Sequence, residues 1–362
     1  MEAPFERFLD QLDRPVSCII ADTWLPWMAV VGGRRNVPVL SLWTQAPSMF
    51  SIFYHFELLA AHKHFPDEDL QERGEEVIDY LPGLSPMRLV DLPNVIVGKE
   101  GNVLKMLLDA FSFVTKAQGL IFTSWYELQP QVTSALKADL PIPVYTIGPS
   151  IPYFSLQSPS SDSIPSYFRW LDSQPESSVL FVSLGSYIPL SSDQMEEIFM
   201  GLNASQIRYL WIVRGEISSL QGACGELGLI VPWCEQLRVL CHPSVGGFMT
   251  HCGWNSVMEG IFAGVPMLGF PLAIDQFHNC KLIVEDWKIG LRLKKRVESR
   301  HVVGREDVAQ SVKRLMNLNG SERIKLIRSA QELEETCTRA IKKGGSTDKN
   351  VNDFVKDFVK GQ

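Results

Sequence analysis

The chain has 362 residues, which is enough for two domains with separate hydrophobic cores. Hydrophobic residues make up 45% of the chain and charged residues 21%, the ordinary composition of a soluble globular protein, and the net charge of -7 argues against nucleic-acid binding. No apolar run reaches the roughly 18 residues that a membrane-spanning helix needs.

The first part of the chain alternates short apolar runs with helix-like segments, a pattern typical of βα units around a parallel sheet. Its strand candidates are residues 16–21, 37–42, 120–123 and 144–147. An aromatic-rich stretch, residues 43–65, lies between the second and third candidates and is expected to be helical. We therefore expect residues 1–148 to form one domain.

Residues 149–165 are rich in proline and serine, which predicts a linker without a helix or a central strand. A second βα series follows, and residues 166–345 are expected to form a second domain. Its predicted strands are 179–184, 209–213, 229–231, 246–250 and 266–270, and its predicted helices include 194–202, 256–263, 275–285 and 305–316. After a long polar helix and Gly344-Gly345, a last helix is expected over residues 346–362.

A turn in the second domain has the composition of an anion-binding site. It joins the predicted strand 246–250 to a helix expected to start near Ser256, and ligands of open α/β sheets bind beyond such strand ends. Gly253 allows close backbone approach, and the helix start supplies unpaired N–H groups. With His251 and Asn255 as further hydrogen-bonding groups, the turn is predicted to bind a diphosphate without a metal.

Side chains around this turn suit the rest of a sugar nucleotide. Trp233 ends a predicted strand beside polar residues, where its ring could stack on a base, and the amide of Gln236 could bind the edge of a pyrimidine. Glu259 could accept hydrogen bonds from a ribose diol. Asp275 and Gln276 could bind sugar hydroxyls.

Each of these residues also has a purely structural interpretation. Ser256 and Glu259 have the S-x-x-E spacing of a helix capping box, and a lone Trp after an apolar strand, such as Trp233, usually belongs to a core. Asp275 could be an N-cap and Gln276 a surface polar residue. Only the joint occurrence of the residues favours a binding site.

Residues 233–276 together resemble the plant signature box of the family-1 UDP-glycosyltransferases. One departure is Cys234-Glu235, where the family commonly has Ala-Pro. The resemblance extends to residues 170–186 and to the strand ends at Ala21-Asp22 and Trp43-Thr44, so it covers the chain from about residue 15 to the end.

The resemblance implies an α/β fold of the GT-B type, with two Rossmann-like βαβ domains of which the N-terminal one is incomplete. The first domain would bind the acceptor, the second UDP-sugar, and the last helix would pack back on the first domain. The implied donor-binding residues are Thr44, Ser186, Trp233, Gln236, His251, Trp254, Asn255, Ser256, Glu259, Asp275 and Gln276. Gln276, as the last residue of the box, indicates glucose as the sugar.

The implied reaction is inverting transfer of a hexose to a hydroxyl of a small apolar or phenolic acceptor in plant secondary metabolism. In the family an Asp orients a catalytic His, and Asp22 matches that Asp. None of the seven histidines has the context of the base, so about three βα units, roughly 90 residues, are expected to be missing before Met1. Without a base the rate is expected to fall roughly 10²–10⁴-fold, unless His55, His62 or His64 replaces it.

Other functions stay open at this point. The chain could be a non-catalytic UDP-sugar-binding fragment, or a GT-B-like UDP-sugar epimerase, whereas the lack of GxGxxG argues against a nicotinamide oxidoreductase. Aromatic residues at Trp24, Trp27, Phe50, Phe53 and Tyr54 suggest an apolar aglycone, but such a stripe more often belongs to a core.

The expected partners are UDP-sugar as co-substrate and a small-molecule acceptor, with no further cofactor, no metal, no nucleic acid and no membrane span. The acidic run Asp67-Glu68-Asp69 lies far from the signature box and is interpreted as a solvated loop. Seven cysteines without CxxC spacing and an acidic start that is no signal peptide predict reduced thiols and a cytoplasmic location.

Overall fold

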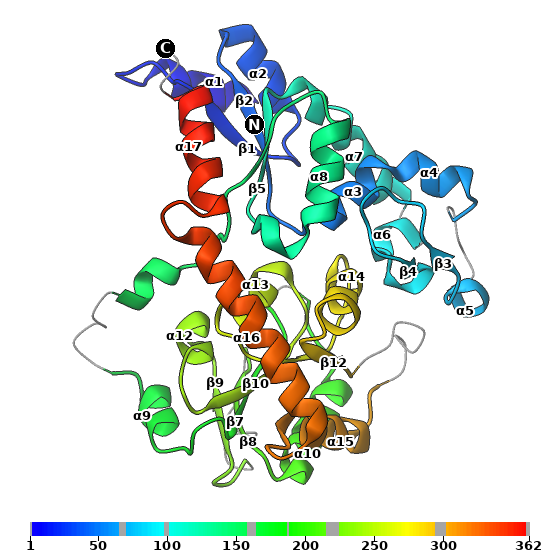
Figure 1. Cartoon of the computed structure of the whole chain (residues 1–362), viewed down its shortest axis with the longest axis vertical. Coiled ribbons are helices and arrows are strands. Elements are labelled where there is room, and N and C mark those ends of the chain that lie inside the picture. Colours follow the sequence, from blue (N-terminus) through cyan, green and yellow to red (C-terminus); the bar gives the residue numbers. More distant parts are fainter. Residues whose placement is uncertain are drawn as a thin grey trace. The chain divides into compact units, whose positions relative to one another are not determined.

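The computed structural model describes residues 2–64, 70–97, 101–157, 164–186, 188–214, 224–293 and 302–359. They form two compact units (Figure 1). Unit 1 consists of Met1–Leu89, Asn94–Ser150 and Cys337–Gln362, and unit 2 of Val90–Pro93 and Ile151–Thr336. The chain therefore passes to unit 2 after Ser150 and returns to unit 1 within the long helix α16 (Ser321–Ile341).

The sheet of unit 1 is parallel and has the strand order β1-β2-β5-β6. Its strands are β1 (Ile19–Asp22), β2 (Val39–Trp43), β5 (Gly119–Phe122) and β6 (Val144–Thr146). All four lie within three residues of the predicted runs, because each run is apolar and is buried in the sheet. β1 is an edge of the described sheet, and Ile20 on it is 46% exposed.

Helices surround this sheet (Figure 1). They are α1 (Glu2–Asp10), α2 (Trp27–Arg35), α3 (Pro47–Tyr54), α4 (Phe56–Ala61), α5 (Leu70–Arg73), α6 (Asn94–Val97), α7 (Gly101–Phe111) and α8 (Pro130–Asp139). The aromatic stripe is partly core. Phe50 and Phe53 are buried against Trp43 and Phe111, whereas Trp24, Trp27 and Tyr54 are half-buried. A short antiparallel pair, β3 (Val77–Ile78) and β4 (Met87–Arg88), was not predicted because two-residue strands leave no period to detect.

The last helix, α17 (Ser346–Phe358), packs against β6 within unit 1. The Tyr145 hydroxyl donates a hydrogen bond to the Asp357 carboxylate at 2.6 Å, and the Thr347 hydroxyl donates to the Gly148 carbonyl at 2.9 Å. Phe354 and Phe358 lie against the Tyr145 ring. These contacts tie the end of the chain to the strand that precedes the crossing into unit 2.

Unit 2 contains a six-stranded parallel sheet with the order β12-β11-β10-β7-β8-β9. Its strands are β7 (Val179–Ser183), β8 (Arg208–Ile212), β9 (Gly228–Val231), β10 (Val245–Thr250), β11 (Met267–Gly269) and β12 (Gly290–Arg292). The two central strands, β7 and β10, are buried along their whole length. The first five in chain order were predicted, whereas β12 was not, because it is short and ends in a charged residue.

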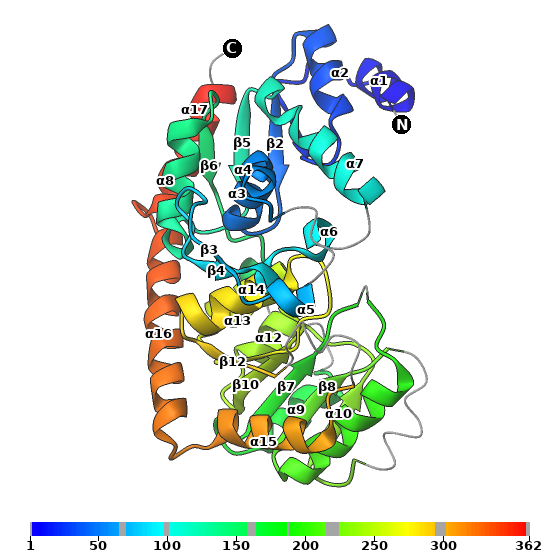
Figure 2. The same ribbon diagram turned by 90° about the vertical axis from the view of Figure 1, so that its right-hand side faces the viewer.

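The helices of unit 2 cover both faces of this sheet (Figure 2). They are α9 (Ser166–Asp172), α10 (Ser192–Ser205), α12 (Gln236–Leu240), α13 (Trp254–Phe262), α14 (Gln276–Lys281) with a π-helical turn at Leu282–Asp286, and α15 (Arg305–Met316). The expected linker contains a 3₁₀ turn at Tyr153–Gln157, which the proline content had argued against. None of the described helices is long and apolar enough to cross a membrane.

The expected α/β class, with two Rossmann-like βα units built on parallel sheets, is thus confirmed. The buried apolar runs determine both sheets, and the polar turns that follow them carry the predicted site.

Candidate active site

The carboxyl ends of the unit 2 strands surround a pocket of about 380 Å³. Small-molecule sites usually have volumes of roughly 300–1,000 Å³, so this pocket is large enough for a substrate. Its wall brings together eight of the residues singled out in the sequence: Ser186, Trp233, Gln236, His251, Trp254, Asn255, Ser256 and Gln276. They come from the turns after β7, β9, β10 and β11 and from the first turn of α13.

His251 lies in the turn after β10 and packs between Gly253 of the same turn and Gly185 of the turn after β7. A Cβ atom at Gly253 would lie 2.4 Å from its Nε2 atom, and one at Gly185 would lie 2.8 Å from the same atom. Gly185 also has a φ of +83°, a conformation that favours glycine. Burial lowers the pKa of His251 to about 4, against a smaller opposing effect of a hydrogen bond with the Ser183 backbone. The imidazole is therefore neutral near pH 7 and acts as a hydrogen-bonding group without a charge.

Helix α13 begins without a side-chain cap. Its N-cap is Gly253, and Trp254 is already helical, two residues earlier than the sequence predicted. The capping-box interpretation of Ser256 and Glu259 is wrong, because Ser256 lies inside the first turn. Without such a cap, the first-turn N–H groups remain available to an anion at the pocket wall.

The side chains of Ser256 and Glu259 have a different partner. Both accept a hydrogen bond from the amide nitrogen of Gln236, at 3.0 Å from the Ser256 hydroxyl oxygen. Burial raises the pKa of Glu259, and the Gln236 hydrogen bond acts in the opposite direction. The structure thus uses Glu259 to fix Gln236 and to join α12 to α13, and Glu259 is not among the described residues that line the pocket.

The two tryptophans of the pocket differ in exposure. Trp233 is 62% exposed, so its interpretation as a core residue is wrong, and its indole is open to a planar ligand. Trp254 is 4% exposed and lies 6.2 Å from the ring of Trp287. Its indole N–H is buried and has no hydrogen-bond partner among the described residues. Buried N–H groups are rarely left unpaired, which makes this donor a ligand-binding candidate.

Gln276 and Asp275 have unequal access to the pocket. The Gln276 amide oxygen accepts from the backbone N–H groups of Leu272 and Ala273, at 2.8 and 3.1 Å, which leaves its NH₂ group for a ligand. Asp275 occupies the N-cap position of α14 without a side-chain capping hydrogen bond. Both residues are buried, so the interpretation of Gln276 as a surface residue is wrong. Burial raises the Asp275 pKa to about 6.

Asp275 acts on the anion-binding turn through Asn279. The Asn279 amide nitrogen donates to the Asp275 carboxylate at 2.7 Å and to the Cys252 carbonyl at 3.0 Å. Cys252 has a φ of +65°, which is uncommon for a residue with a side chain. This network holds the backbone between His251 and Gly253 in place.

Comparison with known proteins decides the family. Residues 155–324 match the family model described as UDP-glucoronosyl and UDP-glucosyl transferase. The chain is 45% identical over 361 residues to UDP-glycosyltransferase 87A2 of Arabidopsis thaliana, covering 99% of this chain and 79% of that protein. The chain belongs to the plant family-1 UDP-glycosyltransferases.

Solved structures of plant enzymes agree with this UDP-glycosyltransferase in fold. The UGT2 enzyme of Phytolacca americana, complexed with UDP-2fluoro-glucose and pterostilbene, has a TM-score of 0.84 and 29% identity, covering 98% of this chain and 78% of its own. An indoxyl-glucosylating UDP-glucosyltransferase of Polygonum tinctorium, in complex with 3,4-dichloroaniline, has a TM-score of 0.85 and 28% identity, with coverages of 98% and 78%. The chain is therefore a UDP-dependent glycosyltransferase of the GT-B fold.

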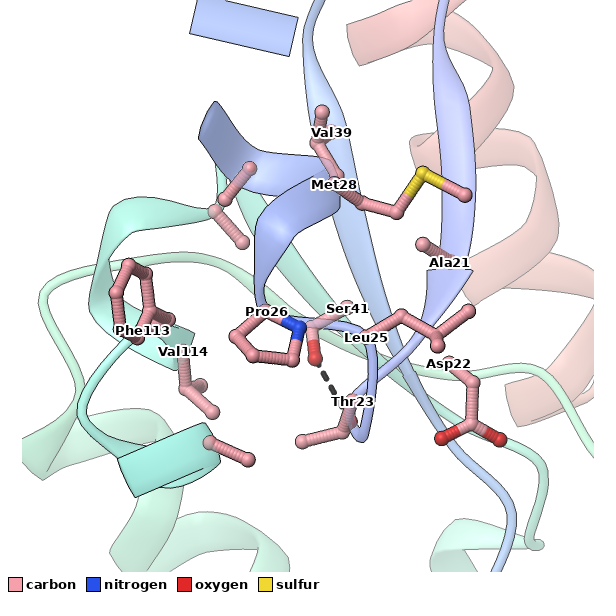
Figure 3. Close-up of a pocket in the computed structure, with 13 residues that line it drawn as sticks. Ala21, Asp22, Thr23, Leu25, Pro26, Met28, Val39, Ser41, Phe113 and Val114 are labelled. Carbon is pink, nitrogen blue, oxygen red and sulfur yellow. Dashed lines mark hydrogen bonds between the residues drawn. The ribbon is translucent and has the colours of Figure 1, made fainter. Parts of the chain in front are cut away.

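The two remaining predicted residues of the UDP-glycosyltransferase lie in unit 1. Thr44 follows β2 and is exposed. Asp22 ends β1, and its carboxylate accepts a hydrogen bond from the Trp24 backbone N–H at 2.9 Å. Beside it, Thr23 and Ser41 share a 2.7 Å hydrogen bond in a cavity of about 20 Å³ (Figure 3). That volume holds one water molecule and excludes a sugar or a phenol.

None of the described histidines is hydrogen-bonded to Asp22, and the three proposed as replacement bases have other contacts. His55 is bonded to the Ser51 backbone at 2.9 Å and lies 3.5 Å from Asp139. The His62 ring stacks 3.8 Å from that of Tyr80, whose hydroxyl is 2.7 Å from His64. A catalytic role for any of them stays a prediction. The described residues contain no cluster of three His, Cys, Asp or Glu suited to a metal ion, and Asp67-Glu68-Asp69 lies outside them.

Sequence reasoning missed five of the described pocket residues: Ser183, Ile188, Ile212, Arg214 and Cys234. Ile212 is the last residue of β8, and Arg214 lies two residues further along, in the turn. The predicted strand ended at Val213, and the turn after it was not considered as part of the site. The signal was available, because a charged residue directly after a buried parallel strand lies on the ligand side of the sheet.

Proposed function

We propose that this enzyme transfers glucose from UDP-glucose to a hydroxyl group of a small apolar or phenolic acceptor, with inversion at the anomeric carbon. The observation that carries the proposal is the pocket of unit 2. It combines an exposed indole, an uncapped helix start and a buried indole N–H on one wall. These groups suit a planar base, a diphosphate and a sugar hydroxyl.

Each part of the donor has a candidate partner. Trp233 stacks on the uracil, and Gln236, held in place by Ser256 and Glu259, binds the nucleoside. The first turn of α13, with Asn255 and the neutral His251, binds the diphosphate. Trp254 and the free NH₂ group of Gln276 face the sugar, where Asp275 acts by fixing the turn. Ser186 and Thr44 complete the proposed donor-binding set, and Glu259 supports it through Gln236.

The reaction follows from charge development. The acceptor oxygen attacks the anomeric carbon, the bond between that carbon and the diphosphate oxygen breaks, and the acceptor proton passes to a general base. The family resemblance gives Asp22 the role of orienting that base, and no described histidine is hydrogen-bonded to Asp22. Negative charge grows on the leaving UDP. The α13 start and the His251 ring therefore stabilise the transition state more than the bound donor.

A hollow in unit 1 supports a small apolar acceptor. It has a volume of about 340 Å³ and is lined by Trp24, Met106 and Phe113, with Lys105 and Asp109 at its polar positions. Trp24 is the member of the predicted aromatic stripe that lines this hollow. We propose that unit 1 binds the acceptor and unit 2 the donor.

The proposed reaction needs no metal and no cofactor other than UDP-sugar, and no nucleic-acid partner. None of the seven cysteines, all within the described part of the chain, forms a disulfide, which supports a reducing, cytoplasmic location.

Calorimetric titration with UDP tests the proposal. The wild-type chain is expected to bind UDP, and Trp233→Ala is expected to weaken binding by about 1–3 kcal/mol through the lost stacking. Trp287→Phe, which keeps an aromatic ring beside Trp254, serves as the control and should bind UDP like the wild type. Absence of UDP binding in the wild type would contradict the proposal. UDP release from UDP-glucose and a phenol tests turnover, and binding without turnover would favour a non-catalytic module.

A further inference from the structure

Arg214 is a charged pocket residue that has no role in the donor contacts described above. It lies two residues beyond the end of β8, and its side chain is exposed at the pocket wall. β8 lies between β7 and β9 in the sheet. Arg214 therefore stands between the turn that carries Gly185 and Ser186 and the turn that carries Trp233.

Arg214 differs in charge from the other described residues of the pocket wall. A nucleoside diphosphate is an anion, yet Arg214 is the one permanently charged residue among the described residues that line the pocket. His251 is neutral near pH 7, because burial lowers its pKa to about 4. The other polar wall residues are Ser, Asn, Gln and Trp, which carry no charge. Without Arg214, only the helix start and neutral donors would oppose the diphosphate charge.

Arg214 also lacks a protein counterion within the described part of the chain, where no hydrogen bond or ion pair engages its guanidinium. Four other arginines of unit 2 form ion pairs: Arg238 with Glu235, Arg292 with Asp91, Arg305 with Glu197 and Arg314 with Glu322. An arginine is exposed without a partner on many surfaces, and its place on the wall of an anion site is what distinguishes this one.

We propose that the Arg214 guanidinium binds the diphosphate of the sugar-nucleotide donor and is the positive charge of the donor site. The inference rests on the proposed function of the pocket. A guanidinium presents a planar fork of N–H donors that matches two phosphate oxygens, and such charge-assisted bonds are about twice as strong as neutral ones. Because charge on the diphosphate increases as UDP leaves, Arg214 also stabilises the transition state.

Titration of the full chain with UDP, UMP and uridine tests this role. Arg214→Gln keeps an amide donor and removes the charge, and it is expected to weaken UDP binding roughly tenfold or more. The affinity for uridine should change less than about twofold, because uridine has no phosphate. The loss of affinity for UMP should lie between those for uridine and UDP. Arg214→Lys keeps the charge without the fork and should recover part of the loss. The UDP affinity of the wild type should fall more steeply with salt than that of Arg214→Gln.

The matched control is Arg314→Gln, which neutralises another arginine of unit 2 that does not line the pocket. It should bind all three ligands like the wild type. Unchanged UDP affinity in Arg214→Gln would overturn the inference while leaving the proposed function intact. Equal losses for UDP and uridine would assign Arg214 to the base and also overturn it. A wild-type chain that fails to bind UDP would overturn the proposed function itself.

Discussion

The turn after β10 in unit 2 and the turn after β1 in unit 1 both place a polar side chain at the end of a parallel strand. The first opens into a pocket of about 380 Å³, whereas the cavity beside the second has about 20 Å³. Glycines at positions 185 and 253 make room around His251, and an uncapped helix follows. Asp22 instead accepts the backbone N–H of Trp24. The helix that follows β1, α2, also begins without a side-chain cap, so the glycines that leave space around His251 are what distinguish the two turns.

The largest expected effect comes from filling the space beside His251. Gly185→Ala adds a Cβ atom 2.8 Å from the imidazole and forces alanine into a φ of +83°. We expect UDP affinity to fall roughly 100-fold, since backbone strain of about 1–2 kcal/mol adds to overpacking of about 1–3 kcal/mol. Calorimetric titration with UDP measures the loss.

Gly225→Ala is the matched control for this substitution. Gly225 has a φ of +60°, but a Cβ atom there would meet nothing within 4 Å. Alanine at this position therefore has the energetic cost of a positive φ but no steric contact of its Cβ atom, and the UDP affinity should stay near the wild-type value. If both variants lose UDP affinity equally, the close packing of Gly185 against the His251 ring is not what determines the affinity of the site.

The next effect is on stability at low pH. Burial lowers the pKa values of His251 and His278 from 6.5 to about 4, so the unfolded chain binds more protons than the folded one between these values. Stability should therefore be lost as pH falls from about 6.5 to about 4. Burial raises the Asp275 pKa from 3.8 to about 6, which acts in the opposite direction, because the folded state then holds the extra proton.

Thermal melting between pH 7 and pH 4 tests this balance. The melting temperature of the wild type should fall with acidification, and His278→Gln should fall less steeply because one of the two histidines no longer titrates. His242→Gln removes a histidine that lies 3.1 Å from Asp172 near the surface and serves as the control. Parallel pH profiles for the wild type and His278→Gln would show that this histidine does not carry the acid sensitivity.

Ser256→Ala distinguishes the two interpretations of the α13 start at a smaller scale. A capping box predicts a loss of about 1 kcal/mol in unfolding free energy with no effect on ligands. The structure predicts the reverse. Ser256 lines the pocket and accepts a hydrogen bond from Gln236, and in the Ser256→Ala variant the Gln236 side chain still has Glu259 as a partner. We expect a several-fold loss of UDP affinity, of roughly 1 kcal/mol, with unfolding free energy nearly unchanged. Denaturant unfolding and UDP titration of the same variant measure both.

The smallest effect is expected in unit 1. Asp22→Asn keeps an oxygen that can accept the Trp24 N–H, so the turn should persist. Because Asp22 belongs to the other compact unit, we expect UDP affinity within about twofold of the wild type. A large loss of UDP binding in this variant would show that the two turns do not act separately.

The sequence predicted the strands and the pocket wall well where the signal is local. Buried apolar runs identify β7 and β10, and the closely spaced residues from Trp233 to Gln276 indicate the donor pocket. The start of α13 was misplaced because Gly253 caps it without a side chain, so the Ser256 to Glu259 spacing suggested a later start. Asn279, which bonds Asp275, also bonds the Cys252 carbonyl 27 residues earlier in the chain, and no local pattern reports such a contact.

A crystal structure of this chain with UDP tests the central claim most directly. The uracil should stack on Trp233, and the diphosphate should meet the N–H groups at the start of α13 beside His251, with the Arg214 guanidinium within hydrogen-bonding distance of a phosphate oxygen. UDP bound elsewhere, or a bound UDP whose phosphates leave the α13 start vacant, would contradict the assignment of this pocket as the donor site.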